Sequence, residues 1–263
     1  MRDAVTVVKV GGTVLDDPVR CDAFLSAFAS VGSPRVLVHG GGAIASDMQH
    51  RMGVAPVMVD GRRVTDDETL RIVTMTYAGW INTSLTARLL ALGCRTHGIA
   101  ACSGGLVRAR RRSAHPVDFG HVGDVTSVDA SVLRHLLAGD CTPVVAPITA
   151  DEDGALLNTN ADTIAAELAI ALAASSDVTL LYCFERDGVL ADMRDAQSRV
   201  RTLSRLEARA LEGAGAIGGG MMPKLANAFR AAEQGVRRVV VCNADDLGVV
   251  MDDAGQHGTE ITA

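Results

Sequence analysis

Continuous runs of aliphatic residues alternate with longer amphipathic segments along nearly the whole chain. Such runs, which few polar residues interrupt, are typical of strands that are covered on both faces in a parallel sheet. We therefore predict strands, with helices between them, at residues 4–10, 35–38, 57–59, 95–99, 142–147, 178–183 and 237–242. This alternation indicates an α/β fold with a mainly parallel, open sheet.

Two helix starts have the spacing of a capping box, in which a hydroxyl residue precedes a glutamate by three positions. Thr65 with Glu68, and Ser204 with Glu207, both have this spacing at the head of a helical pattern. We therefore expect helices to begin next to Thr65 and Ser204.

Residues 104–125 depart from the alternation of strands and helices. They are rich in glycine and arginine and contain two short strand-like pieces, at residues 106–112 and 117–125. We predict that these pieces pair as a small antiparallel hairpin attached to the main sheet. Such a hairpin would act as a flap beside the substrate.

The length and composition indicate one large folded unit. The chain has 263 residues, of which 48% are apolar, and a mean hydropathy of +0.21, so it can bury a substantial core and is not disordered. No internal repeat or low-complexity linker divides it. We expect residues 1–263 to form a single domain with two lobes, residues 1–150 and 151–263, with the boundary near residues 151–157.

The charge pattern argues against a nucleic-acid partner. The formal net charge is −6, and the one basic run holds only four arginines, at positions 108, 110, 111 and 112. This run is short and lacks interleaved aromatic residues, so we interpret it as a solvated hairpin or loop.

The cysteines and the amino terminus indicate a cytoplasmic location. Six cysteines are scattered along the chain without a C-x-x-C pair, so the sequence specifies neither a zinc site nor a disulfide framework. Lys9 interrupts the first apolar run too early for a signal peptide, and no apolar stretch has the length of a membrane span. We therefore expect no membrane partner and a reducing compartment.

Glycines follow two of the predicted strands at the same kind of position. Lys9 and Gly11-Gly12 lie at the end of the first strand, and His39 with Gly40-Gly41-Gly42 ends the second. The carboxyl ends of parallel strands meet at one edge of the sheet, where glycine backbone can approach phosphate oxygens closely. We expect the active site at this edge.

Other glycine signatures are weaker candidates. The chain has no P-loop motif, and the G-x-G-x-x-G at residues 213–218 follows a helical pattern instead of a strand. The G-x-G-x-x-A at residues 40–45 follows a strand, and Asp60 ends another at nearly the distance of a dinucleotide fingerprint. A nicotinamide-dependent oxidoreductase therefore stays as an alternative, although it leaves Lys9 without a role.

Two further segments combine polar side chains with helix starts. In residues 158–162, Asn160 is a candidate helix cap, whereas Asp162, one turn into a helix, would repel a phosphate unless it orients lysines or cation-bound water. In residues 218–224, three glycines lead into a helix whose first turn carries Lys224. A lysine there opposes the helix dipole, and a bound anion would remove that conflict.

Five motifs in this order resemble the amino acid kinase family over essentially the whole chain. They also resemble, within it, the members that phosphorylate an acylated glutamate. The motifs are Lys9-Val10-Gly11-Gly12, His39-Gly40-Gly41-Gly42, Gly61-Arg62-Arg63-Val64-Thr65, Asn158-Thr159-Asn160-Ala161-Asp162 and Gly220-Met221-Met222-Pro223-Lys224.

The resemblance implies a three-layer αβα sandwich that uses ATP and Mg²⁺ to convert an N-acyl-L-glutamate into its γ-acyl phosphate. The amino-terminal lobe would bind the acyl-amino acid and the carboxyl-terminal lobe MgATP. Lys9 and Lys224 would neutralise the transferred phosphoryl group, with Asp162 holding the lysines in place. Backbone amides of Gly11, Gly12 and Gly41 would bind phosphate, and Gly42, Arg63 and Asn158 would hold the acylated glutamate.

This chemistry fits the residues present. A γ-carboxylate is ionised at neutral pH, so it needs no general base, and the barrier lies in bringing two anions together. We therefore interpret His39 as a structural residue that fixes the glycine turn rather than as an acid or base.

Several points stay open at this stage. Acetyl and succinyl are both open as the acyl group, because an arginine of the flap that points inward would favour the extra carboxylate of succinyl. A kinase for an acylated aminoadipate of lysine biosynthesis and a non-catalytic nucleotide sensor are further alternatives. The resemblance also implies a homodimer without arginine feedback, with the helical pattern at residues 66–92 as its face. Residues 182–188 differ from the Thr-Asp that many members of the family carry there.

Overall fold

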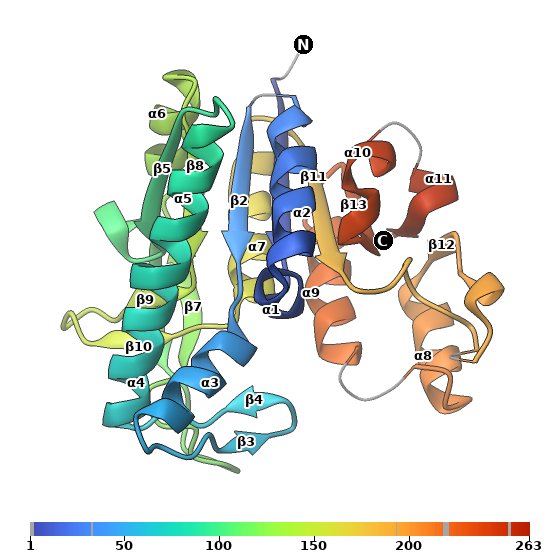
Figure 1. Cartoon of the computed structure of the whole chain (residues 1–263). Helices are drawn as coiled ribbons and strands as arrows, with labels where there is room; N and C mark the ends of the chain where they lie inside the picture. The colour runs from blue at the N-terminus through green and yellow to red at the C-terminus, as the bar shows by residue number, and fades with distance from the viewer. Residues whose placement is uncertain (1–2, 33, 193, 218–220, 252–253) are drawn as a thin grey trace.

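An eight-stranded sheet forms the centre of the molecule (Figure 1). The computed structural model describes residues 3–32, 34–192, 194–217, 221–251 and 254–263. Within these, the strand order is β12-β14-β13-β11-β1-β2-β8-β5, and every pairing is parallel except that of β13 with β14. The strands are β1 (Ala4–Val10), β2 (Arg35–His39), β5 (Thr96–Ala100), β8 (Thr142–Ala146), β11 (Asp177–Phe184), β12 (Thr202–Leu203), β13 (Arg238–Asn243) and β14 (Gly258–Ile261).

Most strands predicted from the sequence belong to this sheet, and the prediction of a mainly parallel α/β fold is confirmed. The exception is the run at residues 57–59. It forms β3 (Met58–Val59), which pairs with β4 (Arg62–Arg63) in a separate two-stranded hairpin. This hairpin lies beyond the carboxyl edge of the main sheet, below α3 (Gly42–Arg51) in Figure 1.

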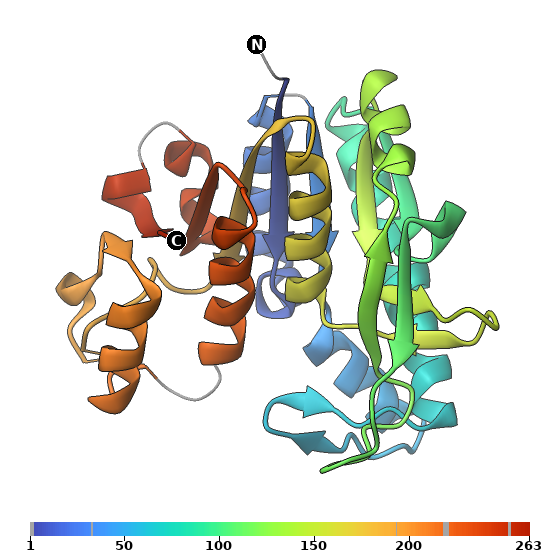
Figure 2. The same cartoon turned by 180° about the vertical axis from the view of Figure 1, so that it is seen from behind.

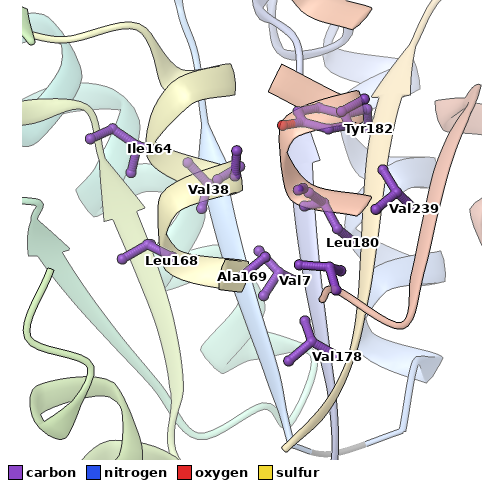
Figure 3. Close-up of a cluster of buried hydrophobic side chains, with 14 of the residues drawn as sticks. Val7, Val38, Ile164, Leu168, Ala169, Val178, Leu180, Tyr182 and Val239 are labelled. Atoms are coloured by element: carbon purple, nitrogen blue, oxygen red, sulfur yellow. The ribbon is translucent and has the colours of Figure 1, made fainter. Parts of the chain in front are cut away.

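Helices cover both faces of the sheet, which makes the three layers expected from the sequence (Figures 1 and 2). Successive residues of a strand point to opposite faces, so Val7 packs in the core under α7 while Val8 packs in the core under α2. Figure 3 shows the first of these cores, in which Ile164 and Leu168 of α7 lie over the sheet. One face carries α2 (Pro18–Ser30), α5 (Asn82–Ala91) and α10 (Leu247–Val250), and the other carries α6 (Ser131–Ala138), α7 (Ala161–Ala173), α8 (Arg205–Gly213) and α9 (Met222–Glu233).

The predicted hairpin exists, but its place differs from the prediction. It pairs β6 (Val107–Arg111) with β7 (Gly123–Val128), later than the expected 117–125. Instead of joining the main sheet, it belongs to a second, four-stranded sheet of order β10-β9-β6-β7. The added strands are β9 (Ile148–Ala150) and β10 (Leu156–Asn158).

The chain passes from the main sheet to this second sheet across a single residue, Pro147, which separates β8 from β9. Residues 151–155 form the turn between β9 and β10. In this turn the Asp151 N–H donates to the Ala155 carbonyl at 3.0 Å. The place suggested for a boundary between lobes is thus a hairpin turn inside one sheet, and the division into two lobes stays a prediction.

One of the two predicted capping boxes is present. Ser204 and Glu207 cap α8 reciprocally, which confirms that prediction. At the other site the cap is Asp66, whose carboxylate accepts the Thr69 amide at 2.8 Å, while the Thr65 hydroxyl bonds the Arg63 carbonyl. Asp66 rather than Thr65 is the cap, because its carboxylate reaches an amide in the first turn of α4 (Asp67–Thr74) that has no partner within the helix.

After α4 the chain continues without a break through a π-helical segment (Met75–Ile81) into α5. Other short helices are α1 (Gly12–Asp16) and α11 (Ala254–His257). None of the helices in the described ranges is long and apolar enough to cross a membrane.

Candidate active site

Two glycine turns meet at the carboxyl edge of the neighbouring strands β1 and β2. A Cβ added to Gly12 would lie 3.0 Å from the Gly42 nitrogen, so the two turns touch through backbone. Gly41 has φ +152°, and a Cβ there would lie 2.3 Å from Ile81 Cδ1. A side chain at Gly12 would push the two turns apart, and the positive φ of Gly41 would strain the backbone of any other residue.

The amides of these turns are not equally available for an anion. Gly12 begins α1 and Gly42 begins α3, so their amides have no partner within their own helices. Gly11 differs from the expectation, because its N–H donates to the Cys183 carbonyl at 3.2 Å. Gly11 thus joins β1 to β11, and the amides that remain free of intrahelical partners are those beside it.

Lys9 and Asp162 form a buried ion pair. The Lys9 Nζ lies 2.7 Å from Asp162 Oδ1, and each side chain is 7% exposed. Lys9 comes from β1 and Asp162 from the first turn of α7, which begins where Asn160 caps the helix by accepting the amides of Asp162 and Thr163. The capping interpretation of Asn160 is therefore confirmed.

Lys224, in the first turn of α9, approaches the same place from the other end of the chain. Its Nζ lies 4.3 Å from the centre of the Phe184 ring, and the Lys9 Nζ lies 4.8 Å from the same centre. The two ammonium groups therefore cannot be further apart than these two distances combined. Residues 218–220, the glycines expected to lead into this helix, lie outside the described residues.

Burial lowers the pKa of the Lys224 ammonium. The neighbouring charge of Lys9 lowers this pKa further, whereas the carboxylates of Asp162 and Glu185 raise it. Desolvation is the largest of these effects and disfavours the charged form. An anion bound between the lysines would restore the charged form, as a phosphoryl group does in phosphoryl-transfer sites.

A cleft of about 270 Å³ extends from Lys9 and Asp162 along the glycine turns to the flap. It gathers most of the residues that the sequence singled out, although Gly11 and Lys224 do not line it. The predicted site residues on its wall are Lys9, Gly12, Gly41, Gly42, Arg63, Asn158 and Asp162.

Arg63 lies buried in this cleft with 7% of its surface exposed. Its guanidinium donates to the Gly42 carbonyl and to Ser46 Oγ, each at 2.8 Å, and to Gln49 Oε1. Within the described ranges, no carboxylate lies within ion-pair distance of it. A buried guanidinium held only by neutral groups is a strong site for an incoming carboxylate.

Asn158 lies at the end of β10 on the wall of the same cleft. Its amide donates to Thr65 Oγ1 at 3.1 Å, and its backbone N–H donates to the His121 carbonyl at 2.8 Å. These bonds fix Asn158 between the second sheet and the segment that carries Arg63.

His39 is fully buried and has the structural role expected of it. Its Nδ1 lies 2.8 Å from the Gly40 carbonyl and its Nε2 lies 3.1 Å from the Asn82 amide. Burial lowers the pKa of the imidazole to about 4, so the ring is neutral at physiological pH. A neutral ring with both nitrogens in use holds the glycine turn and is not an acid or base.

Two further arginines line the cleft, Arg62 of the motif at residues 61–65 and Arg112 of the basic run at residues 108–112. Arg112 follows the last residue of β6, and its Nη2 lies 2.5 Å from Asp124 Oδ1. Burial and the charge of Arg112 lower the pKa of Arg62. Successive arginines along the flap strand point to opposite faces, and the sequence alone does not determine which face is turned toward the cleft.

The dinucleotide interpretation does not fit this geometry. Asp60 lies in the turn between β3 and β4 with φ +48°, away from the edge of the main sheet. A ribose-binding acid would have to end a strand next to the glycine turn.

Comparisons with known proteins show which family this chain resembles. Residues 4–243 match the model of the amino acid kinase family. The chain is 42% identical to the acetylglutamate kinase of Cytophaga hutchinsonii, covering 98% of both proteins. It is 45% identical to the acetylglutamate kinase of Bacteroides thetaiotaomicron, covering 94% of this chain and 96% of the other.

A solved structure, the carbamate kinase from Giardia lamblia bound to AMP-PNP, has the same fold. It superposes with a TM-score of 0.71 over 99% of this chain and 98% of the other, at 15% identity.

Proposed function

The chain belongs to the amino acid kinase family, and on that premise we propose that it transfers the γ-phosphoryl group of ATP to the γ-carboxylate of N-acetyl-L-glutamate. The products would be ADP and the acyl phosphate, in the second step of arginine biosynthesis. The name of both curated relatives supports this substrate, because they align with this chain over nearly its full length.

One observation carries the proposal. Two lysines from opposite ends of the chain meet over the Phe184 ring. The cleft beside them contains the buried Arg63 guanidinium, which has no acidic partner among the residues that the structure describes. A site of this kind suits one ligand with phosphates and another with a carboxylate. In this assignment Lys9 and Lys224 neutralise the transferred phosphoryl group, and Asp162 keeps Lys9 in position.

The acyl-amino acid would lie in the cleft. Arg63 would pair with its α-carboxylate, and Asn158 and Gly42 would hydrogen-bond to the acylated backbone. The amides of Gly12 and Gly41 would bind phosphate oxygens, with Gly11 in a supporting role because its own amide is engaged. The γ-carboxylate is ionised at neutral pH, so positioning and charge neutralisation do the catalytic work without a general base.

Mg²⁺ fits the carboxylates that this site offers. Mg²⁺ usually retains several waters and binds through substrate phosphates with one or two carboxylates. Asp162 and Glu185 are the acids whose charges act on Lys224, and they would face the ion through water. When bound with ATP, the ion would neutralise the β- and γ-phosphate oxygens.

A second candidate substrate, N-succinyl-L-glutamate, is favoured by one arginine of the β3–β4 hairpin and one arginine of the flap. Arg62 and Arg112 both line the cleft. Asp124 forms an ion pair with Arg112, so two guanidinium groups share this carboxylate and a second carboxylate on the acyl group would find a cationic partner.

We also propose a cytoplasmic homodimer. All six cysteines are free thiols, as a reducing compartment favours. The continuous helix of residues 67–91 exposes Met75, Trp80 and Leu90, of which Trp80 is 68% exposed. A second copy would cover these apolar side chains.

The test supplies MgATP with N-acetylglutamate, N-succinylglutamate, N-acetylaminoadipate or free glutamate, and traps any acyl phosphate with hydroxylamine. We expect hydroxamate from N-acetylglutamate, or from N-succinylglutamate if the second candidate is right. Hydroxamate only from N-acetylaminoadipate would instead assign the enzyme to lysine biosynthesis. ATP binding without any hydroxamate would mean a nucleotide sensor and would overturn the kinase assignment.

A further inference from the structure

Phe184 contacts both candidate catalytic lysines with the face of its ring. It ends β11, next to β1, and is 8% exposed. The Nζ atoms of Lys9 and Lys224 lie 4.8 and 4.3 Å from its centre, inside the ~6 Å range of cation–π attraction. The other rings with a cation over them in the described part of the chain, those of Phe28, Phe119 and Phe229, each have one.

Neighbouring groups fix the orientation of this ring. Tyr182 stacks on Phe184 with the ring centres 6.1 Å apart and the planes inclined by 4°. The Tyr182 hydroxyl donates to the Asp162 backbone carbonyl at 2.9 Å. The ring is thus tied to the helix that carries Asp162, and its place relative to the ion pair is set by packing.

The position of the Phe184 ring is favourable for the electrostatics of the two lysines. Lys9 and Lys224 carry two positive charges in a partly dehydrated place, and Lys9 has only Asp162 as an ion-pair partner among the described residues. The two ammonium groups repel each other, and burial penalises both. A further carboxylate between them would relieve the repulsion but would also repel the phosphates of ATP. An aromatic face attracts cations and carries no net charge.

We propose that Phe184 is a positioning residue for phosphoryl transfer, whose ring holds the ammonium groups of Lys9 and Lys224 together without placing a formal negative charge beside the phosphates. The inference rests on the proposed kinase function and assigns a role within the same site. The lowered pKa of Lys224 supports it, because the charged form of that lysine needs stabilisation from a source other than water.

Fluorinated phenylalanines at position 184 test the role of the ring face. Replacing Phe184 with its 4-fluoro, 3,5-difluoro and 3,4,5-trifluoro analogues in the full chain weakens the negative face in steps and keeps the shape. We expect kcat to fall in the same order, by roughly 3- to 30-fold in total, with little change in KM for the acyl-amino acid. Equal kcat values across the series would overturn the proposal.

A second readout separates this proposal from the kinase function itself. Titration of ¹³Cε-labelled lysines by NMR follows the ammonium groups of Lys9 and Lys224 without any turnover. Nearby charges that act on Lys224 are those of Asp162, Lys9 and Glu185, and the fluorinated variants leave all three in place. We expect the Lys224 pKa to fall further with each fluorine, whereas an unchanged pKa would refute the role of the ring.

The same analogues at Phe24 provide the matched control. Phe24 is buried in α2 and stacks on Phe28, on the opposite face of the sheet from Phe184. Fluorination there must leave kcat and the lysine titrations unchanged. If the native enzyme makes no acyl phosphate, the kinase function fails, but the lysine titrations still decide whether the ring holds the two ammonium groups.

Discussion

Lys9 and Asp162 are joined at 2.7 Å in a place almost closed to water, since only 7% of either side chain is exposed. Lys9 is the penultimate residue of β1, and Asp162 lies in the first turn of α7, the helix that packs on this strand. The ion pair therefore contributes to both the stability of the fold and the geometry of the site, because removing either member leaves a buried charge without a partner.

Asp162→Asn is expected to reduce both activity and stability. The change removes the charge that holds Lys9, so kcat should fall by at least ~100-fold, and the free energy of unfolding should drop by about 3 kcal/mol. Hydroxamate assays and urea unfolding measure the two effects. Glu233→Gln, which breaks the exposed pair with Arg205, should change neither by much, and comparable losses in both variants would count against the special role of Asp162.

Arg63→Ala should weaken binding of the acyl-amino acid. Loss of the guanidinium removes charge-assisted hydrogen bonds, so the KM for N-acetylglutamate should rise by roughly 10- to 100-fold, while the KM for ATP should change little. Steady-state kinetics with each substrate varied in turn measures this split. Arg71→Ala, at an exposed position on α4, is the control, and an equal rise in both KM values for Arg63→Ala would contradict the assignment.

Lys224→Ala should act mainly on kcat. A lysine that neutralises charge only as the phosphoryl group moves stabilises the transition state more than the bound substrates, so we expect a ~100- to 1000-fold lower kcat. Lys224→Arg keeps the charge but not its shape and should retain part of the activity. Near-normal turnover of the alanine variant would place Lys224 away from the transferred group.

His39 should make the protein less stable in mild acid. The unfolded chain binds a proton at this residue near pH 6.5, whereas the folded state binds it only near pH 4. The stabilisation is therefore fully present at neutral pH and is lost as the pH falls through this window, by about 3 kcal/mol in all. Urea unfolding of the native protein and His39→Gln from pH 7 to pH 4 measures it. Parallel curves for the two proteins would refute the prediction.

Trp80→Lys should produce a monomer. The substitution places a charge on the exposed apolar face of residues 67–91, which an interface between two copies would have to bury. Light scattering after size exclusion measures the mass. Val19→Lys, at an apolar residue of α2 that is 78% exposed, should leave the dimer intact, and an unchanged dimer in both variants would move the interface elsewhere.

The sequence was most informative where the physical signal is local. Continuous aliphatic runs predicted β1, β2, β5, β8, β11 and β13 to within one or two residues, because burial on both faces leaves little room for polar residues. The remaining strands of the main sheet, β12 and β14, were not predicted. Glycines after β1 and β2 predicted the position of the cleft. This signal is also local, because residues without a side chain allow the close contact of Gly12 with Gly42.

Other features depend on residues far apart in the chain. Strands β9 and β10 have three residues each, too few for a recognisable pattern. The sequence therefore predicted a hairpin attached to the main sheet instead of a separate second sheet. The bond of Gly11 to Cys183 and the place of Phe184 under two lysines arise from the pairing of β1 with β11. The sequence gives no sign of which strands become neighbours, so these contacts escaped prediction.

The space that a Gly12 side chain would need is already taken by the backbone of the neighbouring turn, 3.0 Å away. The glycine turns after β1 and β2 therefore cannot change independently in evolution, because a larger residue in one turn requires the backbone of the other turn to move away. Directed evolution of new substrate preferences on this scaffold should consequently leave both loops alone and draw its variation from the arginine-bearing segments across the cleft.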